Sequence, residues 1–172
     1  TVLAESSVFN RLSVVWERLS VMFHTHFRRN RIYAIDLGHS GFDITELPEF
    51  RQADVIHLHW INEGMLSLGS VEKIIASGKP IVWTMHDMWP FTSVCHYAHD
   101  CDYYTHHCHD CPQLNSRKYH DASYRVFERK KSLLDGANIQ FVACSRWLGN
   151  MASNSSLLHG RKISCIPNAI NI

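Results

Sequence analysis

Four short apolar segments constrain the fold of this chain more than any other feature. They occupy residues 54–59, 80–85, 139–144 and 163–166, and polar or turn-forming residues follow each one. Strands that are apolar on both sides are typical of a parallel sheet with both faces buried. Helical signals separate the segments, at residues 70–76, at residues 122–134 and from Ser145 onward. The alternation predicts the α/β class, with a doubly wound parallel sheet and helices on both faces.

The amino-terminal region predicts one further helix. Its apolar residues recur at steps of three and four, which marks one face of an amphipathic helix; they are Phe9, Leu12, Trp16, Leu19, Phe23 and Phe27. Three arginines follow, at positions 28, 29 and 31, and positive charge is favourable at a helix carboxyl end. Residues 32–35 are predicted as a short strand. Ser70 is the expected N-cap of the helix over 70–76, and Gly78 is expected to close it.

Composition excludes several classes of protein. The chain has 172 residues, of which 45% are hydrophobic, so it can bury one sizeable core. A formal net charge of +1 provides no basic field for nucleic acid. No uncharged apolar run approaches the roughly 20 residues that a membrane span needs. No signal peptide is recognisable, which predicts a reducing, cytoplasmic compartment.

Polar and aromatic residues follow the predicted strands, where ligands bind in open parallel sheets. The candidate ligand-binding residues are therefore His59, Trp60, Asn62, His86, Asp87, Ser145, Arg146 and Asn168. For Ser145 and Asn168, helix capping and turn formation explain the residue types equally well. We interpret the His86 and Asp87 pair as functional, because this dipeptide is not a standard turn signal. Neither GxGxxG nor GxxxxGK[ST] occurs, so the sequence predicts neither a dinucleotide site nor a P-loop.

The histidines of the first predicted strand allow an alternative function. His57 and His59 are two residues apart and face the same side of a strand. Together with His86 and Asp87 they could bind a catalytic metal ion, as in a metal-dependent hydrolase. In the structural alternative, one histidine packs under a helix and the other lines a pocket. No carboxylate directly follows His59, which makes the hydrolase the less favoured interpretation.

Four clustered cysteines give the sharpest local signal. Cys95, Cys101, Cys108 and Cys111 have the spacing C-x5-C-x6-C-x2-C, and Pro112 follows. Four thiolates suit one tetrahedral zinc ion with a structural role, which would hold the loop at 95–112 together. An iron–sulfur cluster is also compatible with CxxCP, and two disulfides would need an oxidising compartment. Cys144 and Cys165 stand apart and are predicted to be small buried apolar residues.

The segments read together resemble a known family. They are DVIHLHW from Asp54, KPIVWTMHDMWPFT from Lys79, CHY from Cys95, CHDCP from Cys108, VACSRWL from Val142 and IPNAIN from Ile166. Their order and spacing are similar to the amino-terminal half of bacterial family 4 glycosyltransferases, particularly those of surface-polysaccharide assembly. The resemblance runs from about Arg51 to the last residue, and the first fifty residues are less distinctive.

The resemblance implies a GT-B enzyme, in which two Rossmann-like domains face a cleft. The amino-terminal domain mainly binds a glycan or lipid-linked acceptor, and the other domain binds the nucleotide-sugar donor. The family histidine near the reacting centre corresponds to His86, and we expect Asp87 to orient it. Ser145 and Asn168 correspond to residues near the cleft, while His59, Trp60 and Trp89 would line the acceptor side by position. The resemblance also implies that the sugar is transferred with retention of anomeric configuration and that the enzyme associates peripherally with the cytoplasmic membrane. It implies no particular oligomeric state.

Two departures from the family lead to further expectations. The chain contains no acidic donor-binding motif, and it has no opening strand with a glycine-rich loop. We therefore expect residues 1–172 to be a single Rossmann-like domain of a larger two-domain enzyme, inactive alone. The family does not require a metal ion for catalysis, so zinc is assigned to structure. A third alternative, besides the transferase and the hydrolase, is a binding module that zinc holds together and in which the cysteine loop carries the function.

Overall fold

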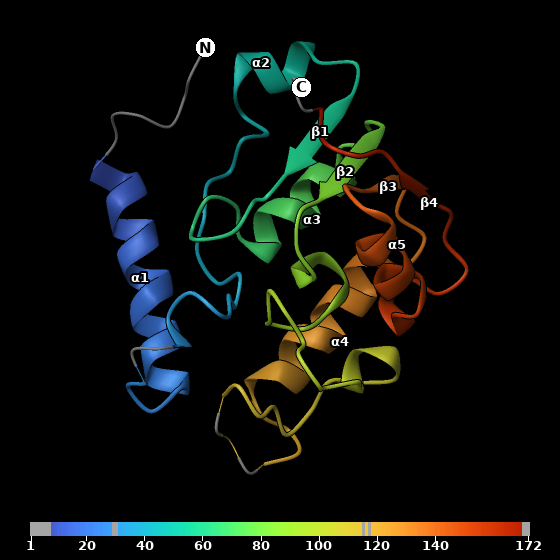
Figure 1. Cartoon of the computed structure of the whole chain (residues 1–172). Coiled ribbons are helices and arrows are strands. Elements are labelled where there is room, and N and C mark those ends of the chain that lie inside the picture. The colour runs from blue at the N-terminus through green and yellow to red at the C-terminus, as the bar shows by residue number, and fades with distance from the viewer. Residues whose placement is uncertain (1–7, 29–30, 115, 117, 170–172) are drawn as a thin grey trace.

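Four parallel strands form the sheet in this computed structural model, which describes residues 8–28, 31–114, 116 and 118–169. The strands are β1 (Ile56–His59), β2 (Ile81–Met85), β3 (Ile139–Ala143) and β4 (Ile163–Cys165), and they lie side by side in this order. Trp83 of β2 pairs with Leu58 of β1 and with Phe141 of β3. The predicted α/β class and parallel sheet are confirmed (Figure 1).

Three helices connect successive strands: α3 (Leu68–Ala76), α4 (Ala122–Leu134) and α5 (Arg146–Ser153). Each helix is capped at its amino end by a side chain that accepts a backbone N–H of the first turn. The capping residues are Ser67 for α3, Asp121 for α4 and Ser145 for α5. The predicted bounds of α4 and the cap at Ser145 are confirmed. The predicted N-cap at Ser70 is wrong, because Ser67 caps α3 by accepting the Ser70 N–H at 3.0 Å.

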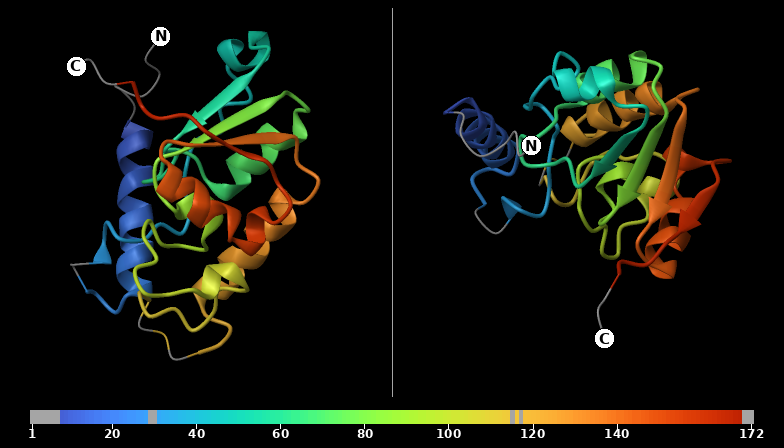
Figure 2. Two further views of the ribbon diagram at one scale, coloured as in Figure 1. Left: turned by 45° about the vertical axis from the view of Figure 1, so that its right-hand side comes forward. Right: turned by 90° about the horizontal axis from the view of Figure 1, so that it is seen from above.

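The sheet is covered mainly on one face, which corrects the expectation of helices on both faces. Connections between parallel neighbours are right-handed, so strands added in one direction place their helices on one side. Side chains of all three helices share one core with Trp83 and Phe141. On the opposite face His57 and Gln140 are exposed, and Val82 and Ser164 are half-buried. Figure 2 shows the helices relative to the sheet from two sides.

A buried lysine ties α4 to the loop that follows β2. Lys130 is 2% exposed, and its ammonium donates to the carbonyl oxygens of Trp89, Thr92 and Ser93 at 2.6, 3.2 and 2.8 Å. The ammonium also lies 3.3 Å from the centre of the Trp89 ring, a cation–π contact. Burial lowers the pKa of Lys130 to about 7. The lysine thus fixes the short 3-10 helix η2 (Trp89–Phe91) directly after His86 and Asp87.

Helix α1 (Val8–His24) lies beside the sheet domain, and the short α2 (Pro48–Gln52) precedes β1 (Figure 1). The predicted amphipathic helix is confirmed, although Phe27 lies beyond its end and Arg29 lies outside the described residues. The predicted strand at 32–35 is wrong. Only Ile35 makes an isolated antiparallel bridge there, to Cys95, which anchors the start of the cysteine loop.

Candidate functional site

The candidate residues lie after the carboxyl ends of the parallel strands, at one edge of the sheet. His59 ends β1, His86 and Asp87 follow β2, Ser145 and Arg146 follow β3, and Asn168 follows β4. Parallel pairing places these strand ends at the same edge, where ligands bind in open α/β sheets. The parallel strand order therefore places these residues at one edge of the sheet, as the sequence predicts.

An imidazole pair is the most polar feature of this edge. His59 Nδ1 and His86 Nε2 are 3.0 Å apart, so one ring nitrogen donates a hydrogen bond and the other accepts it. His57 lies on the same side, with its Nε2 2.8 Å from the Thr84 hydroxyl and its ring 4.1 Å from the His59 ring. Burial, and then the neighbouring His59, lowers the pKa of His57. His59 is exposed and His86 half-buried, so both can reach a ligand.

Asp87 organises a separate, buried network. One carboxylate oxygen accepts the Trp60 indole N–H at 3.1 Å and lies 2.5 Å from His96 Nδ1; the other accepts the Trp89 backbone N–H at 2.9 Å. Asp87 therefore directs its carboxylate to Trp60, Trp89 and His96, and His86 contacts His59 in place of the expected orientation by Asp87. Sequence reasoning missed His96 in this role, because His96 lies inside the cysteine loop, directly after Cys95, and not at the end of a predicted strand.

Besides Asp87, two more candidate residues prove to be buried. Trp89 is 1% exposed, and its indole N–H donates to the Asp36 carbonyl at 2.8 Å. Trp89 therefore packs in the core rather than lining an acceptor surface, and we remove it from the candidate set. Asn62 is 4% exposed, and its side-chain nitrogen has no hydrogen-bond partner in the described part of the chain. A buried donor without a partner is costly, so Asn62 has capacity for a ligand.

A cavity of about 620 Å³ adjoins the imidazole pair along β1 and the loop after it. Its wall is mainly apolar, with Val14 from α1 on one side and Met65 on another. His59, Trp60 and Asn62 are among its polar lining residues, and the carboxylates of Asp43 and Glu63 also line it. Binding sites for small molecules commonly combine an apolar wall with a few directed polar groups, and this cavity has both.

The residues after β3 and β4 contribute less to this geometry. The Ser145 hydroxyl accepts the Leu148 N–H at 3.1 Å, so helix capping explains this serine. Arg146 and Asn168 are exposed, and Arg146 adds positive charge to the edge. A ligand role for the three residues stays a prediction.

The histidines do not form a ready metal site. Within the ranges that the structure describes, no group of three or more histidine, cysteine, aspartate or glutamate side chains is placed to hold one ion. His57 uses a ring nitrogen to contact Thr84, while His59 and His86 use theirs to contact each other. Their arrangement gives no support to the metal-dependent hydrolase.

The four clustered cysteines line one small apolar pocket, together with Tyr104 and Ser123. All are free thiols in the structure. Burial, and then neighbouring thiols such as Cys95, raises the pKa of Cys111 to about 12 and raises that of Cys108 still further. Four cysteines are suitable zinc ligands, but in the described residues their sulfur atoms do not surround one point. The loop would have to change conformation to bring them together around a zinc ion. Outside the cluster, Cys165 is exposed, which corrects its expected burial.

Zinc binding by the cysteine cluster stays a prediction with a direct test. We expect mass spectrometry to find one zinc ion per purified chain, and we expect the Cys108→Ser/Cys111→Ser variant to lose it. The Cys144→Ser/Cys165→Ser variant is the matched control and should keep its metal. Zinc that survives the first double change would point to the histidines instead. Metal-free protein throughout would contradict the prediction, and visible absorbance with bound iron would indicate an iron–sulfur cluster.

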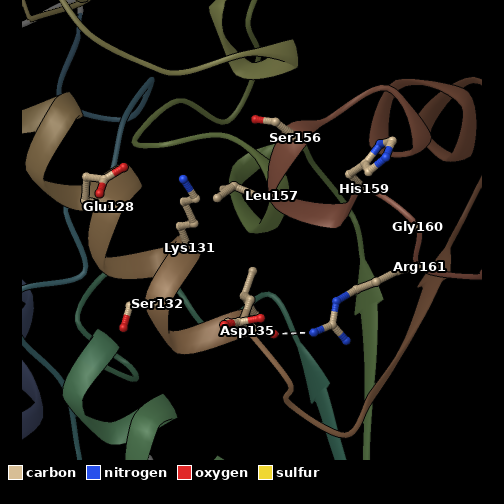
Figure 3. A pocket seen from close by; sticks show the side chains of 10 residues that line it. Glu128, Lys131, Ser132, Asp135, Ser156, Leu157, His159, Gly160 and Arg161 are labelled. Carbon is tan, nitrogen blue, oxygen red and sulfur yellow. Dashed lines mark hydrogen bonds between the residues drawn. The ribbon is translucent and has the colours of Figure 1, made fainter.

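A second cavity, of about 630 Å³, lies at the opposite edge of the sheet (Figure 3). Glu128 and Lys131 of α4 face it from one side, and His159 faces it after the 3-10 helix η4 (Ser156–Leu158). Arg161 donates to the carbonyl oxygens of Leu134 and Ala137, at 2.9 Å for Ala137, so it closes the end of α4. The residues that line this cavity come just before β3 and β4 in the chain. The cavity therefore lies near the amino ends of these strands, away from their carboxyl ends.

Comparison with known proteins gives one partial match. The chain is 34% identical over 68 residues to a protein of Escherichia coli (strain K12) described as "Putative colanic acid biosynthesis glycosyl transferase WcaC". The match covers 36% of this chain and 17% of that protein, so the chain spans only a small part of this relative. No family model and no solved structure matches the chain. What the comparison supports is similarity, over part of the chain, to a glycosyl transferase.

Proposed function

We propose that this chain is the acceptor-side domain of a glycosyltransferase, which moves a sugar from a nucleotide-sugar donor to a glycan or lipid-linked acceptor. The observation that carries the proposal is the His59–His86 pair at the carboxyl edge of the sheet, beside a cavity of about 620 Å³. The partial similarity to a glycosyl transferase favours the same reaction class. The proposal extends to GT-B architecture, family 4 membership, retention of configuration and a cytoplasmic location.

The residues of the edge have distinct roles in this proposal. The Trp60 indole is 42% exposed and is held by Asp87, so its ring offers a rigid apolar face to the C–H side of a sugar. The Asn62 amide and the His59 imidazole provide hydrogen bonds to acceptor hydroxyls. Holding the acceptor hydroxyl near the anomeric carbon replaces a bimolecular encounter with an oriented one.

His86 contributes at the reacting centre in this proposal. Its imidazole shares a hydrogen bond with His59, so the pair can accept or donate a proton as a sugar hydroxyl requires. The leaving diphosphate needs positive charge and backbone donors, which we assign to the donor-binding part of the enzyme. The hydrogen bonds of the buried Asp87 with His96 and with the exposed Trp60 hold the loop after β2 in place in this proposal.

A turnover assay tests the reaction class. The full-length protein that contains this chain is incubated with a panel of labelled nucleotide sugars and a glycolipid fraction from the source cells. We expect equal amounts of label transferred to the acceptor and of nucleoside diphosphate released. Release of free sugar in place of transfer would indicate hydrolysis, and no turnover of any donor would contradict the proposal.

A further inference from the structure

Two exposed aromatic side chains stack on each other at the carboxyl edge of the sheet. Trp147 is the second residue of α5, which follows β3, and Tyr97 lies in the loop that follows β2. Their ring centres are 6.3 Å apart, and the ring planes are inclined by 28°. Trp147 is 52% exposed and Tyr97 is 50% exposed. We call these two residues the Tyr97–Trp147 pair; neither belongs to the candidate set.

Both members of the pair are held in place by their surroundings. The Tyr97 carbonyl oxygen accepts a side-chain N–H of Gln113 at 2.9 Å, and Gln113 in turn accepts the Arg31 guanidinium at 3.0 Å. Trp147 is fixed through α5, because the next residue, Leu148, is 2% exposed and packs in the core. A ligand that stacks on rings already in position loses little affinity to the ordering of the protein.

A short series of contacts connects the pair to the candidate site. His96 precedes Tyr97 in the chain, and its Nδ1 lies 2.5 Å from the Asp87 carboxylate. The His96 ring centre is 6.4 Å from that of Trp60. Neighbouring strands lie roughly 5 Å apart, so the end of β3 is about 10 Å from the end of β1. An extended ligand bound beside Trp60 can therefore reach the pair along the same edge.

The polar residues around the pair indicate the kind of ligand. Arg146 precedes Trp147 on α5, and Asn150 lies three positions after it, on the same side of the helix. Both are exposed. A sugar unit presents a C–H face that packs on an aromatic ring, and hydroxyl groups that bond to polar side chains. Two stacked rings with a polar rim provide both kinds of contact.

Other partners fit the pair less well. In the residues that the structure describes, no helix is long and apolar enough to cross a membrane. Docking of a protein or of a membrane surface is typical of contiguous apolar patches of several hundred Å². The apolar residues next to the two rings in the chain, Ala98 and Leu148, are 5% and 2% exposed. The pair therefore stands as two rings among polar neighbours, which favours a sugar.

We propose that the Tyr97–Trp147 pair is a second sugar subsite, which binds a unit of the acceptor glycan remote from the reacting hydroxyl. This inference rests on the proposed function and narrows its substrate class to acceptors with several linked sugar units. The sugar stacks on the face of the Trp147 ring that Tyr97 leaves open, and the Asn150 amide bonds to its hydroxyls. The subsite adds acceptor affinity and takes no part in the chemistry at His86.

The dependence of KM on acceptor length tests this subsite in the full-length protein that contains this chain. The probes are glycans released from the glycolipid fraction of the source cells, used whole and shortened from the reducing end to a single unit. Every probe thus keeps the same accepting sugar. We expect Trp147→Ala to raise KM for the whole glycan about five-fold and to leave kcat within about two-fold. KM for the single unit should stay unchanged, because that probe does not reach the pair.

Matched variants separate stacking from a structural role. Trp147→Phe keeps an aromatic ring and should restore most of the affinity for the whole glycan. Tyr119→Ala is the control, because Tyr119 is 54% exposed and stacks on His109, with ring centres 4.3 Å apart. It should leave KM for both probes unchanged. If Trp147→Ala raises KM equally for both probes, or for neither, the subsite proposal is overturned.

A binding measurement decides the question even if the released glycans are not turned over. The full-length protein is labelled with 5-fluorotryptophan, and the Trp147 resonance is assigned in fluorine NMR spectra from its absence in Trp147→Phe. We expect this resonance to shift with the whole glycan and not with the single unit. Such a shift without turnover would support the subsite and count against the proposed reaction alone. No shift with either probe would overturn the subsite, even where sugar transfer proceeds.

Discussion

Replacing Lys130 with methionine is expected to lower the free energy of unfolding by about 3 kcal/mol, because three buried carbonyl oxygens lose their donor. The methionine side chain keeps most of the apolar stem, so the change removes the ammonium and little of the packing. The affected carbonyls belong to Trp89, Thr92 and Ser93, in the loop directly after the candidate site. The variant should therefore loosen the segment that positions His86 and Asp87.

Urea unfolding followed by circular dichroism measures this effect. Lys131→Met is the matched control, because Lys131 is the next residue of α4 and is exposed. It should change the free energy of unfolding by no more than about 0.5 kcal/mol. Equal effects of the two substitutions would show that the buried ammonium has no special role.

Replacing Asp87 with alanine is expected to cost about 3 kcal/mol of stability, because it removes the shared acceptor of His96, Trp60 and the Trp89 backbone N–H. His96 is 7% exposed and would be left without its carboxylate partner. Asp87→Asn should have a smaller effect of the same sign, because an amide provides one acceptor oxygen in place of two.

The same unfolding measurement, with Asp100→Asn as the control, tests the Asp87 network. Asp100 is exposed and should tolerate the change. Loss of the indole hydrogen bond should also free the Trp60 ring, which is detectable as a shift of its indole N–H resonance in NMR spectra. An unchanged resonance and unchanged stability would mean that Asp87 does not organise this loop.

Local patterns were sufficient to predict the four strands of the sheet and the starts of α4 and α5, but they also predicted a strand at 32–35 that the structure does not contain. Four of the five residues of β2 are buried, in keeping with its mainly apolar sequence. Ser145 caps α5 by accepting the backbone N–H of Leu148, only three residues later. The N-cap of α3 shows the limit of such patterns. Ser67 and Ser70 are chemically identical candidates, and only the backbone geometry places Ser67 at the cap.

Longer-range contacts account for what the sequence did not reveal. The apolar face of α1 has the spacing of a core helix, yet it faces solvent because Glu17 is bound by residues about twenty positions away. Trp89 follows a candidate site residue closely, but Lys130, forty-one residues later, covers its ring. His96 joins Asp87 across a loop that local patterns identify only as rich in cysteine and histidine.

The comparison of His86→Ala with His159→Ala in the full-length protein tests the central claim most directly. His86 lies at the carboxyl edge of the sheet beside His59, whereas His159 lines the cavity at the opposite edge. If sugar transfer occurs at the carboxyl edge, His86→Ala should lower kcat about 100-fold and His159→Ala should leave it within about two-fold. Transfer kinetics unchanged by His86→Ala, or lowered equally by both substitutions, would contradict this account.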